Sequence, residues 1–191
     1  MENLLRHHKP QNFSDRVALA FTKFLRLLAD TFFKKKYGHR AVVLETVAAV
    51  PGMVAGMLLH LKSLRKMQDD KGWIKILLDE AANERMHLMT FIKIAKPTFI
   101  ERIIIMMAQF IFILMYLVIY LLSQRTAHRI VGYFEEEAVI SYTEYLKEIE
   151  DGKIENIKAP EIAIKYWNLP LNSRLRDVIE VIRNDEAGHR D

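Results

Sequence analysis

The segment IIIMMAQFIFILMYLVIYLL, residues 103–122, contains twenty residues, and Gln109 is its only strongly polar side chain. About twenty consecutive apolar residues in a helix are enough to cross the hydrocarbon core of a bilayer. The segment therefore predicts a helix that either crosses a membrane or lies along one, and the remainder of the chain has to be compatible with that helix.

The rest of the chain also favours helices. Gly and Pro are scarce, and apolar residues recur at helical spacing between short polar breaks. We expect six helices with short connections, typical of an antiparallel bundle, near residues 14–33, 39–67, 73–95, 99–122, 127–149 and 172–191. A chain of 191 residues is about the size of one domain, so residues 1–191 are expected to form a single all-α domain.

Composition narrows the classes of site and partner. The chain has no Cys, which excludes disulfides, thiolate metal sites and cysteine nucleophiles. The net charge of +4 is mild, but the cluster KKKYGHR, residues 34–40, could meet anionic lipid or nucleic acid. No groove-reading motif supports nucleic acid, so we expect lipid. The start MENLLRHHKP shows the layout of neither a signal peptide nor a transit peptide.

Two Glu-x-x-His pairs stand on predicted helices: Glu84 with His87, and Glu186 with His189. Residues three apart share one face of a helix, so each pair can aim at a common ligand. Random placement gives roughly 0.5 such pairs in a chain of this composition, and two pairs alone are weak evidence. Two further helices add carboxylates, because Glu45 lies in the apolar run AVVLETVAAV and three acids lie in GYFEEEA.

These acids and histidines together indicate a metal site. A buried lone carboxylate is costly unless it is paired or bound to a metal. One Glu from each of two helices and a Glu-x-x-His from each of two others form the ligand set of di-iron and di-manganese carboxylate bundles. Imidazole ligands suit iron better than magnesium or calcium. The alternative reading is a set of solvated acids with capping histidines.

Four longer motifs resemble a known family: LETVAAVPGMVAGMLLHLKSLRKM, NERMHLMTF, YFEEEA followed by SYTEYLKE, and RNDEAGHRD. From about Phe32 to the last residue, the chain resembles the alternative oxidases, which are membrane-bound di-iron quinol oxidases. The resemblance implies a ferritin-like four-helix bundle with a di-iron centre of two non-haem iron ions, plus additional membrane-associated helices. It implies an enzyme that oxidises ubiquinol and reduces dioxygen to water, insensitive to cyanide and without pumping protons.

The resemblance also implies roles for particular residues, and it selects the first of the three acids in EEEA as a ligand. The implied metal ligands are Glu45, Glu84, His87, Glu135, Glu186 and His189. Hydrogen-bonding residues around them would be Asn83, His128, Trp167 and Asp185, and such partners orient ligands. Tyr142 would be redox-active or proton-coupled, with Glu137 or Asp185 moving protons. The quinol pocket would be lined by Arg26, Arg40, Leu44, Glu137, Ala138 and Ser141.

A shared metal pair constrains how residues 103–122 meet the membrane. If this segment crossed a bilayer once, a core of about 30 Å would separate the ligands before it from those after it. We expect no other segment to be long and apolar enough to bring the chain back. The segment should therefore lie in one leaflet beside the helix near 14–33, with basic residues near lipid phosphates. The resemblance implies the same arrangement, as a homodimer, in a bacterial cytoplasmic membrane or the mitochondrial inner membrane.

Other readings stay open. A plastoquinol terminal oxidase shares the ligand pattern, but its extra residues before the last Glu-x-x-His are not seen here. Other di-iron carboxylate oxidases or stores are soluble, and the apolar segment would be a liability in water. A non-catalytic helical protein that docks on membranes is an alternative of another class. Two departures from the family pattern are Gly188, where the family has a second His, and an end of the sequence two residues after His189.

Overall fold

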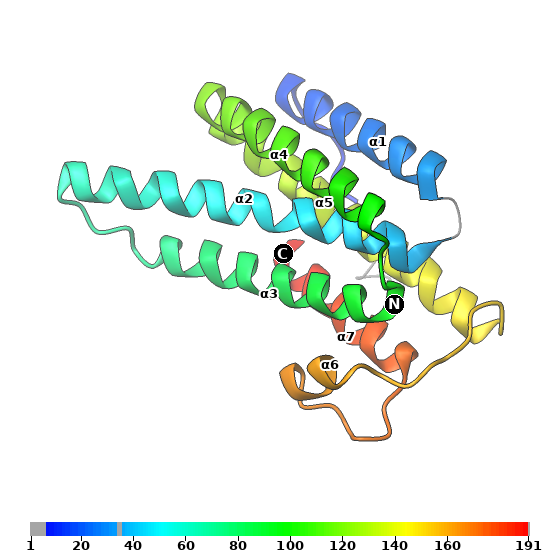
Figure 1. The fold of residues 1–191 in the computed structure, drawn as a ribbon. Coiled ribbons are helices and arrows are strands. Elements are labelled where there is room, and N and C mark those ends of the chain that lie inside the picture. Colours follow the sequence, from blue (N-terminus) through cyan, green and yellow to red (C-terminus); the bar gives the residue numbers. More distant parts are fainter. Residues whose placement is uncertain (1–6, 34–35, 191) are drawn as a thin grey trace. The chain divides into compact units, whose positions relative to one another are not determined.

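The computed structural model describes residues 7–33 and 36–190, and in these ranges the chain forms seven α-helices and no strand beyond one isolated bridge (Figure 1). The predicted all-α class is confirmed. Lys34 and Lys35 of the basic cluster lie outside the described residues. The helices are α1 (Phe13–Phe33), α2 (Tyr37–Lys66), α3 (Trp73–Ala95), α4 (Phe99–Leu122), α5 (Gln124–Glu150), α6 (Glu161–Tyr166) and α7 (Leu175–Arg190).

Local signals place the bounds of α3 and α4 where the sequence predicts them. The chain leaves α3 at Lys96, whose backbone is left-handed, and Pro97 follows. Thr98 then caps α4: its hydroxyl accepts the backbone N–H of Glu101, and the Glu101 carboxylate accepts the backbone N–H of Thr98. This reciprocal capping box satisfies two N–H groups that a helix start leaves open.

The prediction of six helices is wrong by one, because the segment expected to be a loop contains α6. Backbone N–H groups of Ala163 and Ile164 donate to the carbonyl of Pro160, and both side chains are buried. The last helix begins at Leu175 rather than near 172, since Arg174 is held in an extended bridge with Lys158. Tertiary packing therefore decided both features.

The chain forms two compact units, one from the segments up to Tyr37 and from His128 onward, the other from Gly38–Ala127. Each unit contains two of the four helices on which metal ligands are predicted. Each pair is compatible with half of a di-iron helical bundle. One domain spanning residues 1–191 stays a prediction.

In the unit Gly38–Ala127, α2 and α3 lie side by side as an antiparallel pair, and α4 packs against α2 (Figure 1). Gly52 permits a close approach, because a Cβ at this position would lie 2.5 Å from the backbone oxygen of Leu77 on α3. Gln109, the polar residue of the apolar segment, donates to the carbonyl of Thr46 on α2 across 3.4 Å. This contact gives α4 a polar attachment one residue from Glu45.

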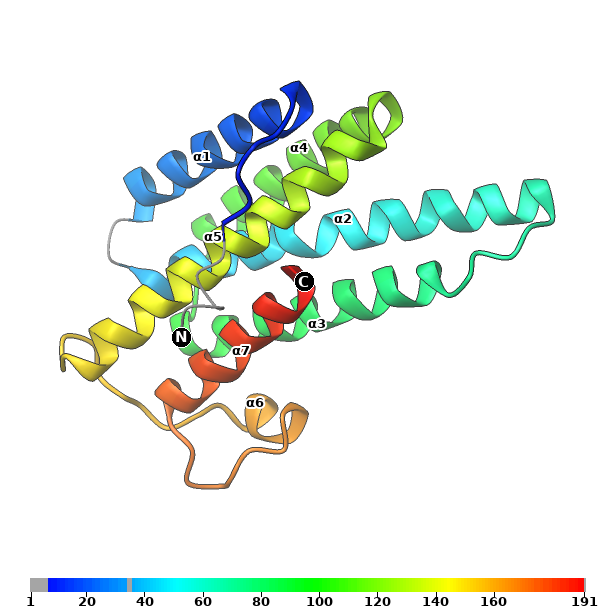
Figure 2. The same cartoon turned by 180° about the vertical axis from the view of Figure 1, so that it is seen from behind.

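In the other unit, α1 lies along α5 (Figure 2). The guanidinium of Arg26 on α1 pairs with the carboxylate of Glu137 on α5, and the rings of Phe21 and Phe134 lie 6.4 Å apart. Val178, Ile179 and Ile182 of α7 are fully buried. The apolar face of α7 therefore holds the helix in place while its other residues carry the predicted ligands.

In the described part of the chain, two helices are long and apolar enough to span a membrane, α2 and α4. The expectation that no segment other than residues 103–122 qualifies is wrong, because α2 passes the same test of length and hydropathy. The two helices differ in burial: 56% of the apolar window of α2 is buried, against 17% of that of α4. Thus α2 behaves as a core helix, whereas α4 leaves most of its apolar side chains uncovered.

Candidate metal centre

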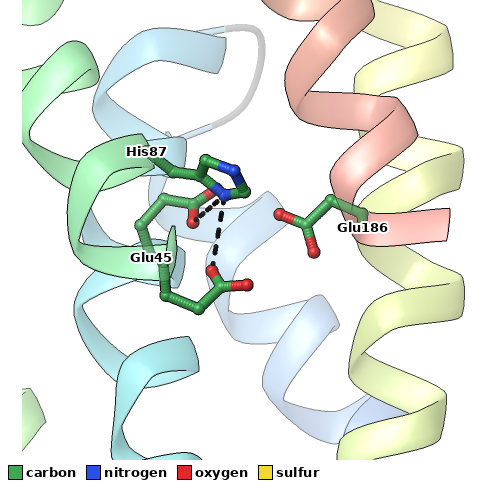
Figure 3. Close-up of side chains that lie close together, drawn as sticks. Glu45, His87 and Glu186 are labelled. Atoms are coloured by element: carbon green, nitrogen blue, oxygen red, sulfur yellow. Dashed lines mark ion pairs between the residues drawn. The ribbon is translucent and has the colours of Figure 1, made fainter. Parts of the chain in front are cut away.

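Three predicted ligands from α2 and α3 meet at one buried point. Glu45, Glu84 and His87 are 2%, 1% and 0% exposed. Nδ1 of His87 lies 3.3 Å from a carboxylate oxygen of Glu45 and 3.5 Å from one of Glu84. Figure 3 shows the side chains of Glu45 and His87 pointing toward one another. Each residue offers one ligand atom, and the three atoms lie within 4.8 Å of one another.

Burial changes the acidity of this first set. The pKa of Glu45 is raised well above its ordinary value, chiefly because burial disfavours the ionised form, and also because the Glu84 carboxylate lies nearby. The imidazole of His87 acts in the opposite direction. A divalent cation would supply the positive charge that these crowded carboxylates need in order to ionise together.

Three predicted ligands from α5 and α7 form a second set. Glu135 and Glu186 are buried, and His189 is half-buried at the end of α7. One ligand atom from each of Glu135, Glu186 and His189 lies within 4.8 Å of the other two. The second set repeats the composition of the first, a lone Glu and a Glu-x-x-His from neighbouring helices.

The three consecutive acids of α5 face different partners. Successive residues of a helix point about 100° apart, so the three carboxylates cannot converge on one site. Glu135 joins the ligand set, Glu136 accepts the backbone N–H of His8 across 2.9 Å, and Glu137 pairs with Arg26. Among the described residues that could hold a metal ion, Glu135 is the one member of this triplet.

The other residues with implied roles lie on α3, α5 and α7 or in the segment between α6 and α7. Nε1 of Trp167 donates to the carboxylate of Asp185 across 2.9 Å, next to Glu186. Tyr142 is buried on α5, two turns from Glu135. Asn83 is half-buried on α3 beside Glu84, and burial lowers the pKa of His128 on α5.

The residues implied in quinol binding divide between the two units. Arg40, which is buried, and Leu44 are one turn apart on α2. Arg26 on α1 contacts Glu137, and Ala138 and Ser141 follow along α5 and are half-buried. Two of the residues that the resemblance assigns to the quinol pocket, Arg26 and Glu137, are thus paired with each other.

The donor chemistry fits a divalent metal. Both sets consist of carboxylate oxygens and an imidazole nitrogen, which are ligands typical of iron in carboxylate bundles. The distances from His87 to Glu45 and Glu84 exceed an ordinary hydrogen bond, so the groups converge without closing into a tight pair. The residues present therefore fit a metal cofactor.

Sequence reasoning missed two residues that position the site. Gly52 sets the close approach of α2 and α3, and the spacing Gly52-x-x-x-Gly56 in an apolar helix was a signal for it. Glu136 binds the segment before α1 through the backbone N–H of His8. The sequence could not predict this contact, because Glu136 lies between two other acids and nothing in the pattern distinguishes it from them.

Comparison with known proteins agrees with this geometry. A family model described as alternative oxidase matches residues 1–191. The chain is 60% identical over 189 residues to "Ubiquinol oxidase 2, mitochondrial" of Glycine max and 59% identical to "Alternative oxidase 3, mitochondrial" of the same plant. It is 59% identical to "Ubiquinol oxidase 2, mitochondrial" of Nicotiana tabacum. These alignments cover 99% of this chain but 57%, 58% and 64% of the relatives. With its two Glu and Glu-x-x-His ligand sets and a family match along its whole length, the chain belongs to the alternative oxidase family.

Proposed function

We propose that this chain is a cyanide-insensitive ubiquinol oxidase that reduces dioxygen to water at two non-haem iron ions without pumping protons. The observation that carries the proposal is the repetition of one buried ligand set, a Glu with a Glu-x-x-His, in each of the two units. The names of the relatives, ubiquinol oxidase and alternative oxidase, support the substrate and the reaction.

The charge of the two ligand sets suits two ferrous ions. Glu45, Glu84, Glu135 and Glu186 contribute four negative charges when ionised, which balances two divalent cations. His87 and His189 would each complete one set as neutral imidazole ligands. The bound iron pair would supply the electron transfer to dioxygen, and the protein would hold the metals and exclude bulk water.

The quinol head group would be received by Arg26, Arg40 and Glu137. Arg26 pairs with Glu137, and in the proposed reaction this acid would take a proton as quinol is oxidised. Leu44, Ala138 and Ser141 would line the pocket. Replacing Arg26 by Gln should raise KM for quinol about tenfold and leave iron content unchanged.

Protons and electrons would pass through residues beside the ligands. Asp185, which accepts the Trp167 N–H, neighbours Glu186 and would move protons as water forms. Tyr142 is buried on the helix of Glu135 and would supply an electron. Asn83 and His128 would orient the ligands beside them through hydrogen bonds.

Attachment to one leaflet of a membrane is part of the proposal. Large apolar side chains of α4 are exposed along its length, including Phe99, Met106 and Phe110, and α1 exposes Phe24 and Leu27. An apolar helix surface with basic residues nearby suits a helix that lies in the interface. Its substrate, with a long isoprenoid tail, would be met inside the leaflet. The relatives' names place those proteins in mitochondria, and the mitochondrial inner membrane is the proposed location; a bacterial cytoplasmic membrane is the alternative.

A homodimer is also proposed. Far from the ligands, the second half of α2 exposes Met57, Leu61 and Leu64. A contiguous apolar surface of this kind is typical of a protein interface. Mass measurement of the detergent-solubilised protein should give twice the protomer mass, and a single protomer would contradict the dimer.

The function is tested by quinol-dependent oxygen uptake and iron analysis on one membrane-bound preparation. We expect uptake that resists cyanide, with two irons per chain. Glu84→Ala and His87→Ala should remove iron and activity together. Asp79→Ala is the matched control, because Asp79 is an exposed acid of the same helix paired with Lys75.

Each measurement can overturn a separate part. Full activity with two bound irons in the Glu84 or His87 variants would refute the ligand assignment. A folded, membrane-bound protein that takes up no iron would favour the non-catalytic membrane-docking alternative.

A further inference from the structure

The first turn of α7 is bound to the segment that follows α5, which passes beside it in Figure 2. Oδ1 of Asn156 accepts the backbone N–H of Arg176 across 3.0 Å. The carbonyl of Ile157 accepts the backbone N–H of Leu175 across 2.8 Å. In return, the guanidinium of Arg174 donates to the carbonyl of Asn156 across 3.0 Å. The start of α7 is therefore fixed by hydrogen bonds from outside the helix.

Asn156 supplies a helix cap that the sequence next to α7 lacks. Arg174 stands immediately before α7, where Ser, Thr, Asp or Asn usually accepts a backbone N–H of the first turn. An arginine side chain has no acceptor atom. The carboxylate of Asp177 accepts the backbone N–H of Arg174 across 2.8 Å, which is one half of a capping box. Asn156 takes the place of the missing capping side chain.

The first turn of α7 also contacts the end of α5. Nε of Arg176 donates to the carboxylate of Glu150, the last residue of α5, across 3.1 Å, and Nη1 of Arg176 donates to Glu180 of α7 across 2.8 Å. These ion pairs lie at the surface and contribute little, because water screens them. Among these contacts, the cap by the half-buried Asn156 is therefore the main directional one.

The buried face of α7 leads from this first turn to the metal ligands. Glu186 follows Leu175 by eleven positions on the same face, or about 16 Å along the axis at 1.5 Å per residue. Burial of the apolar residues between them has no preferred direction, whereas a hydrogen bond depends on angle. The cap therefore fixes the rotation and the axial position of α7, and with them the direction of the Glu186 carboxylate.

The ligand-bearing end of α7 has little local support of its own. Gly188 lies between Glu186 and His189, and glycine weakens a helix. A Cβ at Gly188 would meet no atom of the described residues within 4 Å, so this position is not packed against a neighbour. Because helix formation is cooperative, loosening the first turn should also reduce order at this end.

We propose that Asn156 is a positioning residue for the second ligand set, Glu135, Glu186 and His189. By capping α7, Asn156 fixes where that helix presents Glu186 and His189 to Glu135 on α5. The role is exerted through α7 rather than by binding the metal. The inference rests on the proposed di-iron function, because it concerns how tightly the metal is kept.

Iron release tests the role of Asn156. The full chain in detergent micelles is loaded with Fe(II) without oxygen, and loss of iron to an excess of chelator is followed. Asn156→Ala should release iron about tenfold faster than the wild type, the effect typical of a lost supporting contact around a metal. Asn156→Asp should stay within about twofold of the wild type, because Asp and Asn cap helices about equally well. Hydrogen exchange should show the Arg176 amide about fivefold less protected in Asn156→Ala.

Thr98→Ala is the matched control, because Thr98 caps α4, which carries none of the predicted metal ligands. This change should reduce protection of the Glu101 amide about fivefold and leave iron release unchanged. Wild-type iron release in Asn156→Ala, with or without faster exchange at Arg176, would overturn the proposal. Equally fast iron release in Thr98→Ala would also overturn it, because the effect would then come from general loss of stability.

Hydrogen exchange of the metal-free chain separates this inference from the proposed function. A wild type that binds no Fe(II) would refute the di-iron proposal, and the amides of Glu186 and His189 then test the cap alone. Both amides should be about threefold less protected in Asn156→Ala than in the wild type, and equal protection would overturn the positioning role. If Asn156→Ala does not fold, Asn156→Ser, which has a shorter acceptor side chain, replaces it in both measurements with the same deciding outcomes.

Discussion

Nδ1 of His87 lies 3.3 Å from a carboxylate oxygen of Glu45, and this contact brings α3 and α2 together at a fully buried point. The contact joins two residues 42 positions apart, so it reports on tertiary structure rather than on local helix geometry. At this point burial and the nearby Glu84 raise the pKa of Glu45, and His87 offsets part of that rise, so the ionised form of Glu45 is disfavoured without a cation.

Glu45→Gln should separate metal binding from stability. A Glu whose pKa is raised in the folded state lowers the free energy of unfolding as pH rises above the ordinary Glu pKa of about 4.3. Metal-free wild type should therefore lose stability from acid toward neutral pH, and Glu45→Gln should lose less and be at least as stable at neutral pH. Iron content should fall, and oxidase activity should drop more than about 100-fold. Denaturant unfolding across pH, with iron analysis, measures both. A steeper loss of stability in the variant would contradict the argument.

Gly52→Ala should destabilise the pair α2 and α3. The new Cβ would lie 2.5 Å from the backbone oxygen of Leu77, which cannot move without shifting α3. We expect a loss of about 1–3 kcal/mol in the free energy of unfolding, measured by denaturant titration. Gly188→Ala is the control, because a Cβ there meets no atom of the described residues within 4 Å. That variant should gain about 0.5–1 kcal/mol from better helix propensity. If Gly52→Ala had a higher free energy of unfolding than Gly188→Ala, the packing argument would be refuted.

Trp167→Phe should reduce turnover while leaving the fold intact. The change keeps an aromatic ring but removes the N–H that Asp185 accepts across 2.9 Å. Loss of a hydrogen-bond partner beside a metal ligand typically costs about 10–100-fold in activity or metal affinity. Oxygen uptake and iron content would be measured together, with circular dichroism for helix content. Trp73→Phe, at an exposed tryptophan of α3, is the control and should keep wild-type activity. Equal effects of both changes would count against a role for the Asp185 contact.

Phe110→Asp should weaken membrane attachment. Phe110 is 63% exposed on α4, and transferring such a side chain from water to an apolar phase is worth about 1.5–3 kcal/mol. Flotation with anionic liposomes should show at least about a tenfold fall in bound protein. Met67→Asp is the control, because Met67 is 95% exposed just after α2 and outside α4. A similar fall in both variants would mean that α4 is not the attachment surface.

Local sequence patterns determined a large part of the fold and the identity of the ligand types. Thr98 with Glu101 and the proline before them gave the bounds of α3 and α4, because capping and proline act over a few residues. The spacing of Glu84 and His87 placed both on one face, since a helix repeats every 3.6 residues. The resemblance added the choice of Glu135 among three neighbouring acids, which spacing alone left open.

Only the tertiary structure decided which residues the side chains on each helix face contact. Glu135, Glu136 and Glu137 are chemically identical, yet one joins a ligand set, one binds the segment before α1 and one pairs with Arg26. The helix α6, the late start of α7 at Leu175 and the burial of α2 likewise depend on contacts far apart in the sequence. Helix periodicity gives the direction of each side chain around its own axis, but the partner in that direction depends on how the helices pack.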